Sequence, residues 1–521
     1  MNTHIHSTSS STMTPENDRS THYLPKLYTR NIPWGIFAVA ALLAASVGGL
    51  GIAYGDMELK VLAFAGIIGF VIVMAIYQKP ELGAYLLTIM VFTNASDLMT
   101  TQGLPSINKP LVAVIGVSII ANYFLQTGKF KLPQMGRAEW TLLLFYGVIV
   151  SSSLVSSDLG DALNVIIDVT KDILIGIIIF VTLDTREKWE TCLRVFLATM
   201  TIVGGLGVVK MMSGTEQTFL GLAQLSIIGQ LDASGTLRYG GPIGESNMWG
   251  QVLAASVPLA LYQLRYEKNG RRRLLALLAS LVLLLAVIFT NSRGAFLAMG
   301  LILPLVALEM KIRPVQMMVG ALVIISMFIL LPSNYTERLF SLRAVFQTND
   351  EYALYQDSSF VSRNNQMKAG MAMFWDHPFL GVGFGNYSNH YWKYASELGL
   401  VNSTYRASAQ GRKNPHSLYV EILSEMGLAG FLTFAFFFFS LFASLWRSYK
   451  KYDEYHIHTS WTSWTVALIF SLTTFLISGM FLHGLLFRYI WVLIGFAMSA
   501  VAINREILQA MYQKNQIQWQ G

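Results

Sequence analysis

Cysteine and charge are both scarce in this chain of 521 residues. Its single cysteine, Cys192, excludes an intramolecular disulfide and a metal cluster held by several cysteines. Charged residues make up only 13% of the chain, whereas they make up about 25% of an average soluble protein. Hydrophobic residues make up 53%, and apolar runs long enough to cross a bilayer recur along most of the sequence. These features predict an all-α polytopic integral membrane protein.

The signatures of nucleotide and metal chemistry are also missing from the sequence. The glycine-rich stretch 381–386 follows no clear strand and lacks the Lys-Ser/Thr pair of a phosphate-binding loop, so we interpret it as a turn of glycines with positive φ. No His/Glu pair has the spacing of a zinc site, and we expect neither a metal nor another cofactor. The net charge of +7 comes from basic residues in short loops, so it does not indicate nucleic-acid binding.

The apolar runs predict about 12–14 transmembrane helices. The two weakest are 82–99, which contains Asn94 and Asp97, and 164–183, which contains Asp168. The predicted spans are 34–53, 61–77, 82–99, 108–126, 140–156, 164–183, 193–212, 248–264, 274–291, 294–310, 315–331, 417–446, 460–482 and 484–503.

Lysine and arginine are distributed unevenly over the turns between these spans. They cluster in alternate turns, as in the run Arg271-Arg272-Arg273, on the side of the N-terminal tail, whereas the short turn 156–161 has none. Because basic loops stay on the cytoplasmic side, both termini are predicted to be cytoplasmic. The resulting regions are a disordered cytoplasmic tail (1–33), transmembrane helices with a periplasmic loop at 213–247 (34–331), a large periplasmic loop (332–416), C-terminal transmembrane helices (417–503) and a cytoplasmic tail (504–521).

One stretch of the large loop has the spacing of an amphipathic helix. In the large loop, Phe360, Arg363, Met367, Met371 and Phe374 recur as on one helix face, which predicts a helix of about four turns on the membrane surface. Ser358 and Ser359 would cap its start, and Pro378 lies beyond its end.

The span 164–183 carries charges in its interior. Asp168 and Lys171 are spaced i, i+3, so they share a helix face and can neutralise each other. They form either a structural ion pair between helices or part of a polar cavity at the outer leaflet, and the sequence does not separate these alternatives.

Four arginines fall on the outer side of the predicted topology, against the usual bias of basic residues. They are Arg238, Arg293, Arg363 and Arg488. A guanidinium group donates a fork of hydrogen bonds that matches phosphate oxygens, so converging arginines could hold a pyrophosphate. The alternative for each is a lipid-headgroup contact or a surface ion pair. Further substrate contacts are expected from three neighbouring side chains, Glu245, Asn247 and His483.

His416 precedes an apolar helix, at or near its N-cap. Histidine titrates near neutral pH and is suited to act as general base toward a sugar hydroxyl. The alternative is a histidine that caps the helix or bonds a loop carbonyl. Glu421 and Glu425 follow on one face of the same helix, where they would orient the imidazole, act as base themselves or contact substrate.

Four stretches together resemble the bacterial O-antigen ligase and O-antigen polymerase family. They are Arg-Tyr-Gly-Gly-Pro-Ile-Gly-Glu-Ser-Asn (238–247), Ser-Arg-Gly-Ala (292–295), a segment from Ser-Arg to Gly-Phe-Gly-Asn-Tyr (362–387) and His-Ser-Leu-Tyr-Val-Glu-Ile-Leu-Ser-Glu-Met-Gly-Leu-Ala-Gly (416–430). Each is a weak motif, but they occur in the family's order and on one side of the predicted membrane. The similarity covers roughly residues 200–445.

The resemblance implies about twelve membrane helices and a large periplasmic loop with short helices. It also implies glycosyl transfer, without metal, from an undecaprenyl-diphosphate-linked glycan in the bacterial inner membrane. The matching positions are Arg293 and Arg363, which would bind the diphosphate, and His416, which would act as base or position the acceptor. The chain departs from the family in its two extra predicted spans and its long polar N-terminal tail.

The mechanism we expect follows from these residues. Arg293 and Arg363, with Arg238 beside them, clamp the donor diphosphate, and His416 takes the proton of an acceptor hydroxyl that attacks and inverts the anomeric carbon. The acceptor is another lipid-linked glycan in a polymerase, and lipid A core or a protein hydroxyl in a ligase. Two alternatives remain: a polysaccharide or lipid-linked glycan flippase, whose polar residues would lie near the membrane midplane, and a non-catalytic scaffold for polysaccharide assembly.

Overall fold

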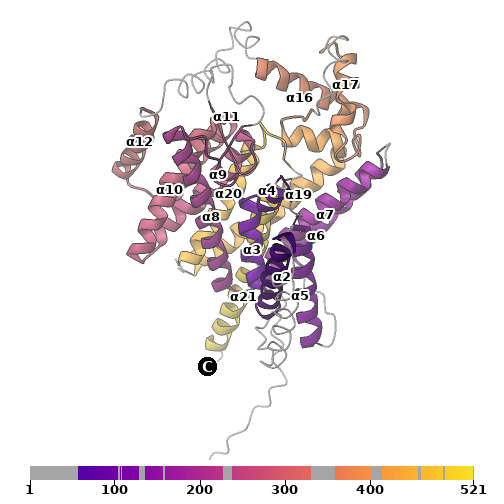
Figure 1. The fold of residues 1–521 in the computed structure, drawn as a ribbon. Helices are drawn as coiled ribbons and strands as arrows, with labels where there is room; N and C mark the ends of the chain where they lie inside the picture. Colours follow the sequence, from indigo (N-terminus) through magenta and orange to yellow (C-terminus); the bar gives the residue numbers. More distant parts are fainter. Residues whose placement is uncertain are drawn as a thin grey trace, which may run out of the picture.

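The computed structural model describes residues 57–101, 103, 106, 108–127, 135–156, 159–226, 237–329, 358–400, 413–455, 459–484 and 487–519. Almost all of these residues are helical (Figure 1). The helices are α2 (Met57–Gln78), α3 (Glu81–Phe92), α4 (Ala95–Thr101), α5 (Asn108–Thr127), α6 (Arg137–Ser153), α7 (Leu159–Thr182), α8 (Arg186–Ser213), α9 (Ser246–Tyr266), α10 (Gly270–Thr290), α11 (Arg293–Glu309), α12 (Pro314–Ile329), α16 (Ser358–Asp376), α17 (Tyr387–Glu397), α19 (Leu418–Glu454), α20 (Ser460–Ser478) and α21 (Arg488–Trp519). In the described part of the chain, strands are limited to β1 (Gln224–Leu225) and β2 (Tyr239–Gly241), which pair antiparallel.

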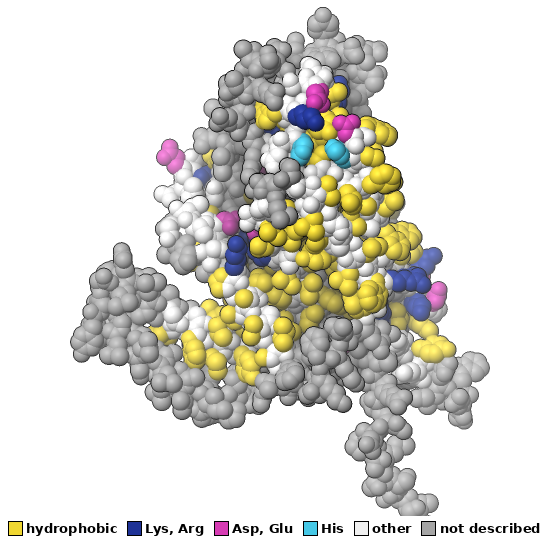
Figure 2. Space-filling model, turned by 90° about the vertical axis from the view of Figure 1, so that its right-hand side faces the viewer, with side chains coloured by type: hydrophobic (Ala, Val, Ile, Leu, Met, Phe, Trp, Pro, Cys, Tyr) yellow, Lys and Arg dark blue, Asp and Glu magenta, His cyan; other side chains and the backbone are white. Residues whose placement is uncertain are grey.

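The composition of these helices confirms the prediction of an all-α polytopic membrane protein. Among the described residues, five helices are long and apolar enough to cross a membrane, or six if the bent pair α3–α4 forms one span. Figure 2 shows hydrophobic side chains over a broad band of one face, with histidine and charged side chains above it and further charged side chains on its left and at its lower right edge. The full count of about 12–14 spans remains a prediction, and the tail 1–33 and the span 34–53 lie outside the described residues.

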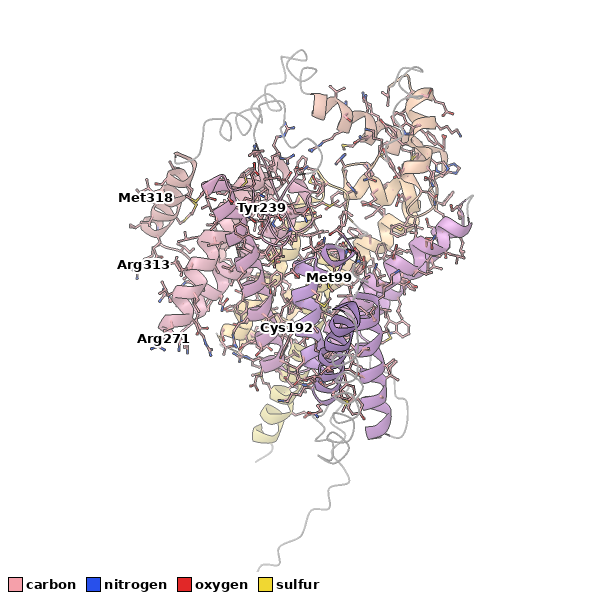
Figure 3. The ribbon with its side chains drawn as sticks, in the orientation of Figure 1. Met99, Cys192, Tyr239, Arg271, Arg313 and Met318 are labelled. Carbon is pink, nitrogen blue, oxygen red and sulfur yellow. The ribbon has the colours of Figure 1, made fainter. Side chains whose placement is uncertain are left out.

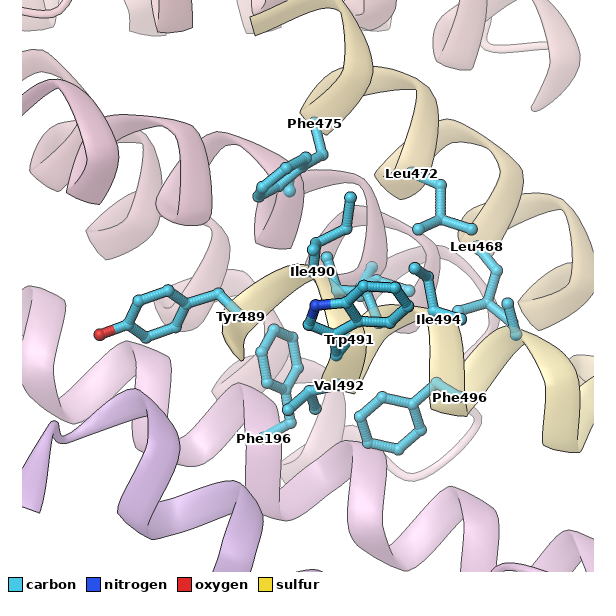
Figure 4. Packing of buried hydrophobic residues seen from close by; sticks show 14 of the residues in the cluster. Phe196, Leu468, Leu472, Phe475, Tyr489, Ile490, Trp491, Val492, Ile494 and Phe496 are labelled. Atoms are coloured by element: carbon cyan, nitrogen blue, oxygen red, sulfur yellow. The ribbon is translucent and has the colours of Figure 1, made fainter. Parts of the chain in front are cut away.

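Long-range packing of aromatic side chains holds the helices together. Trp189 of α8 is fully buried, donates a hydrogen bond from Nε1 to the Phe496 carbonyl of α21 at 3.0 Å, and stacks edge-on against Trp461 of α20 at 5.1 Å. Residues 489–496 of α21 pack against Phe196 and the inner face of α20 (Figure 4). These contacts place α21 and α20 at the centre of the bundle.

Two glycines let α7 and α21 approach almost backbone to backbone. A Cβ atom at Gly176 would lie 2.7 Å from the Trp491 carbonyl oxygen, and one at Gly495 would lie 2.6 Å from the Gly176 carbonyl oxygen. Small residues at helix crossings are common where lipid leaves packing as the main driving force. In the same helix α7, Lys171 pairs with Asp168 at 3.1 Å, as their spacing predicts, and also lies 3.7 Å from Asp172. Whether this pair is structural or part of a polar cavity stays open.

Two predicted spans are broken where the sequence suggested continuous helices. The span 82–99 bends by 56° between α3 and α4, where Asn94 has φ of 51° and its Nδ2 donates to the Pro242 carbonyl at 3.0 Å. The span 417–446 breaks at Gly427, which has φ of 61° and ψ of −157°. Glycine permits both this conformation and the close approach of Phe379, since a Cβ at residue 427 would overlap the Phe379 backbone. The short segment 418–426 therefore forms a separate shelf at the start of α19, which we name the α19 shelf.

Helices α16 and α17 lie at the end of the bundle farthest from the C-terminus (Figure 1). Arg271 and Arg313 lie toward the opposite end, at the lower ends of α10 and α12 (Figure 3). The helix predicted in the large loop is confirmed as α16, whereas its placement on the membrane surface remains a prediction. Its buried residues are Gln366, Ala369, Gly370 and Met373, whereas Met367 is exposed. The stretch 381–386 is the predicted turn of positive-φ glycines.

Candidate functional site

The site begins where two loops meet the α19 shelf. The Leu418 N–H donates to the Gly479 carbonyl at 2.8 Å. Three residues later, the Glu421 carboxylate accepts from the Gly484 N–H at 3.0 Å. These two bonds fix the loop 479–484, which follows α20, against the first turn of the shelf. The loop carries His483, and the residue two before Leu418 is His416, so both histidines are held at the same place.

The two imidazole rings pack edge to face. Their centroids are 5.4 Å apart with an interplanar angle of 85°. His416 has φ of 48°, a left-handed conformation that is uncommon for a residue with a side chain and that clusters at functional sites. Ser417, not His416, caps the helix through its Oγ, which accepts from the Val420 N–H, so the capping alternative for His416 is wrong. Within the described residues, the Nδ1 atoms of both rings are buried without a hydrogen-bond partner.

Burial and positive charge keep both rings neutral. The pKa of His416 is lowered to about 3. Burial is the largest cause, and His483, Arg363 and Lys413 contribute because each disfavours a second positive charge nearby. Burial likewise lowers the pKa of His483 to about 4, with Arg363 as the second cause. Arg363 therefore lies within electrostatic reach of both rings, and each ring is unprotonated at neutral pH.

A second carboxylate positions the helix that carries Arg363. Glu425 of the shelf is buried and accepts from the Gly385 N–H at 2.9 Å and from the Tyr387 N–H at 3.0 Å. The Val382 N–H also donates to the Ser424 carbonyl at 2.9 Å. These bonds dock the glycine turn, and with it the end of α16, onto the shelf.

Two glycines allow this close docking. A Cβ at Gly381 would overlap the Glu425 backbone, and a Cβ at Gly370 of α16 would lie 2.5 Å from a methyl group of Val420. Since Gly381 also has φ of 67°, a side chain there would be strained as well as crowded. The glycine turn is thus the contact surface that brings Arg363 to the histidines.

Arg293 begins α11 beside the same loop. Ser292 caps this helix, and a Cβ at Gly294 would lie 3.0 Å from the Phe481 Cβ, so the first turn of α11 packs on the loop that carries His483. The structure therefore brings the short turn 290–293, the loop 479–484 and the α19 shelf together, as the sequence motifs suggested.

Arg238 braces the turn that carries Arg293. It is buried, and its guanidinium donates to the Thr290 carbonyl at 3.3 Å and to Asn247 Oδ1 at 2.8 Å. Asn247 in turn donates to Glu245 at 3.0 Å, and Glu245 caps α9 through a bond from the Met248 N–H at 2.7 Å. This chain of bonds occupies Arg238, Asn247 and Glu245 with one another and with the backbone.

Arg488 lies in a different charged cluster. Its guanidinium contacts the Asp97 carboxylate of α4 at 2.7 Å, and Asp172 of α7 is close enough to interact with its charge. The contacts of Arg488 therefore join α21 to the bent pair α3–α4, and none of them reaches the histidines.

Lys413 was not singled out from the sequence, although it lies three residues before His416 and interacts with its charge. Its signal was a basic residue at the end of a polar loop, which is too common to be informative. Gln251 was missed as well. Its Nε2 donates to the Phe475 carbonyl at 2.9 Å and so ties α9 to the end of α20. In the described part of the chain, no group of three or more His, Cys, Asp or Glu side chains is arranged to hold a metal ion.

A comparison with protein families gives one match. Residues 278–435 match the family model described as "O-Antigen ligase", which spans less than a third of the chain. The matched region contains Arg293, Arg363 and His416, whereas Arg238 and His483 lie outside it. No curated protein matches the chain.

Proposed function

Since the chain carries a region of the O-antigen ligase family, a family of membrane glycosyltransferases, we propose that it transfers a glycan from undecaprenyl diphosphate to an acceptor hydroxyl. The observation that supports this most directly is the meeting of Arg363, His416 and His483 on the α19 shelf. Three segments that are far apart in the sequence contribute to this point. A neutral histidine with positive φ, within electrostatic reach of an arginine, is suited to acid–base chemistry beside a bound anion.

The arginines are the proposed donor site. Arg293 and Arg363 bind the oxygens of the diphosphate and stabilise its charge as the bond between the anomeric carbon and the phosphate oxygen breaks. Arg238 acts through the turn that it braces, and Glu245 and Asn247 hold Arg238 in place. Because the arginines supply the positive charge, transfer is expected to continue in the presence of a chelator.

His416 is the proposed general base. The acceptor hydroxyl gives its proton to the imidazole, its oxygen forms the new bond to the anomeric carbon with inversion, and the diphosphate leaves with the bonding electron pair. In the unliganded protein the pKa of His416 is about 3, which would make it a weak base. A bound diphosphate places negative charge beside the ring, favours the imidazolium form and raises this pKa toward the working range.

The two glutamates are proposed to position the site, not to act as bases. Each carboxylate accepts hydrogen bonds from backbone N–H groups of a loop, Glu421 from Gly484 and Glu425 from Gly385 and Tyr387. Removing either acceptor would release the loop that carries His483 or the helix that carries Arg363. Arg488, paired with Asp97, is proposed to hold the α3–α4 bend in place near the donor.

The proposed orientation puts this site at the periplasmic face of the bacterial inner membrane, with both termini in the cytoplasm. The distribution of exposed basic residues supports it, since the run Arg271-Arg272-Arg273 is exposed at the start of α10, and Arg271 lies at the lower end of that helix, away from α16 (Figure 3). Ligase and polymerase share the chemistry described here. The acceptor, whether a second lipid-linked glycan, lipid A core or a protein hydroxyl, decides between them.

The purified chain, incubated with a lipid-linked oligosaccharide and each candidate acceptor, tests the proposal by the size of the product. A ladder of repeats identifies a polymerase, and a single addition identifies a ligase. Absence of transfer with every acceptor, together with movement of the lipid between leaflets of a vesicle, would contradict the proposal in favour of a flippase.

A further inference from the structure

A basic pocket lies at the far end of α19 from the histidines. This open cavity of about 680 Å³ is lined by the start of α6 and the C-terminal parts of α19 and α21. Its charged lining consists of Arg137, Arg447, Lys451 and Arg505. No acidic residue appears among the described side chains that line it. The pocket therefore concentrates positive charge from three helices that are far apart in the sequence.

Acidic neighbours neutralise this charge only in part. Arg505 forms an ion pair with Glu139 at 3.4 Å. The guanidinium of Arg447 bonds to the Ala443 carbonyl at 3.0 Å and to Ser444 Oγ at 3.4 Å, and neither of these groups carries charge. Across the described part of the chain, Arg137 and Lys451 form no ion pair either. An anion in the pocket would meet Arg137, Arg447 and Lys451 as well as Arg505, whose charge Glu139 offsets in part.

The wall of the pocket is closely packed at α6. Residue 136 is a glycine, and a Cβ at that position would overlap the guanidinium of Arg505. The absence of a side chain at residue 136 leaves room for the guanidinium of Arg505 at the start of α6. Helix α19 packs on both α6 and α21, so it joins the two sides of the pocket.

An apolar groove continues from the pocket along α19. This second cavity of about 400 Å³ shares Arg137 and Arg447 with the pocket, and Phe436, Phe439 and Ala443 line the rest of it together with Ser440. Phe436 is 54% exposed and Phe439 is 70% exposed, so their rings are open toward the bilayer. The two arginines therefore lie at the boundary between a polar pocket and an apolar groove.

We propose that the pocket and the groove together bind one anionic phospholipid, with its phosphate among the basic side chains and an acyl chain against the phenylalanines. Arginines at the level where a bilayer changes from headgroup to hydrocarbon favour this ligand, because each basic residue near the surface attracts anionic lipid. A free phosphate or polyphosphate would satisfy the pocket equally well but would leave the groove unused. The site is separate from the transfer site, since it lies at the opposite end of α19.

Binding of phosphatidylglycerol to the purified full-length chain in neutral detergent, followed by native mass spectrometry, tests this proposal. The double variant Arg137→Gln/Arg447→Gln should bind this lipid roughly 30-fold more weakly, since two of the basic groups are removed. The variant Arg271→Gln/Arg272→Gln is the matched control, because it removes two exposed basic residues from the start of α10. The control should bind as tightly as the wild-type chain. Equal loss in both variants would contradict the proposal and show a general surface-charge effect.

Two further arms separate the lipid from a soluble anion. Phe436→Ala/Phe439→Ala should weaken phosphatidylglycerol about tenfold, and wild-type protein should bind phosphatidylcholine much more weakly than phosphatidylglycerol. Inorganic phosphate and pyrophosphate, added at millimolar concentration, should displace little of the lipid. Unchanged binding by the phenylalanine variant, or full displacement by pyrophosphate, would overturn the lipid assignment in favour of a soluble phosphate ligand. Thermal unfolding of each variant confirms that it is folded before its binding is compared.

Discussion

The two ends of α19 carry basic residues in contrasting surroundings. At the start of the helix, Arg363 lies within electrostatic reach of two neutral histidines, and the carboxylates of Glu421 and Glu425 accept hydrogen bonds from the backbone of neighbouring loops. At the other end, Arg447 and Lys451 line an open pocket and are exposed. The comparison shows that positive charge alone does not indicate the site of chemistry. A reactive centre also needs a proton acceptor and a backbone that holds it in one geometry.

The largest expected effect is at His416. His416→Ala should lower the rate of glycan transfer by about 10²- to 10⁴-fold, because a general base contributes that much. Arg447→Gln, at the opposite end of the same helix, is the control and should transfer at nearly the wild-type rate. Product formation by both variants is measured with the lipid-linked donor under single-turnover conditions. Equal transfer rates for the two variants would show that His416 is no more important for transfer than Arg447, and would contradict its role as general base.

The next largest effect is expected from the arginines. Arg293→Gln and Arg363→Gln should each lower transfer by about 10²- to 10³-fold, by analogy with the loss of one group that stabilises transition-state charge. Arg363→Lys keeps the charge but not the forked geometry, so its rate should lie between those of wild type and Arg363→Gln. If Arg363→Lys and Arg363→Gln were equally impaired with unchanged donor affinity, a diphosphate contact would not explain the role of Arg363.

A smaller effect on activity is expected at Glu421, where two substitutions distinguish a positioning role from a catalytic one. Glu421→Gln keeps an oxygen that can accept from the Gly484 N–H, so it should retain most of the transfer activity. Glu421→Ala leaves that buried N–H without an acceptor, which costs about 1–3 kcal/mol of folding free energy and loosens the loop with His483. Activity and thermal unfolding are measured for both variants. Loss of activity in a stable Glu421→Gln protein would instead identify the carboxylate as a base.

The smallest effect concerns pH. The pKa values of His416 and His483 are about 3 and about 4, below the ordinary value of 6.5. Between pH 4 and pH 6.5 the unfolded chain binds protons that the folded chain does not bind. With respect to these two groups, the free energy of unfolding is therefore highest above pH 6.5 and decreases as the pH falls toward 4. The midpoint of thermal unfolding should therefore decrease from pH 7.5 to pH 4.5. His483→Gln should flatten the decrease, whereas His377→Gln, at an exposed histidine, should not. An unchanged slope in His483→Gln would show that other groups control this dependence.

The sequence was sufficient to predict an all-α membrane protein and most of its long described helices, because long apolar runs are a local property. It did not predict the break at Gly427 or the bend at Asn94. Both depend on contacts with segments far away in the chain, Phe379 in the first case and Pro242 in the second. A broken span and a straight helix can have the same apolar composition, so hydropathy alone does not reveal the break.

The roles of individual polar residues were also hidden from the sequence. Glu421 and Glu425 lie one helical turn apart, a spacing that suggested a shared task, yet each carboxylate serves a different loop. Arg238 and Arg488 look like phosphate ligands by residue type and predicted side, but the structure shows Arg238 bonded to Thr290 and Asn247, and Arg488 to Asp97. The face of α16 that packs was likewise set by the small residues Ala369 and Gly370, not by the larger apolar side chains.

The central claim is that His416 performs chemistry on a donor that the arginines hold. The most direct test measures donor affinity and single-turnover transfer on the same protein preparations, for wild type, His416→Ala and Arg363→Gln, with an undecaprenyl-diphosphate-linked glycan. We predict that His416→Ala binds the donor with wild-type affinity and does not transfer it, whereas Arg363→Gln binds the donor weakly. Transfer by His416→Ala at the wild-type rate would contradict the account.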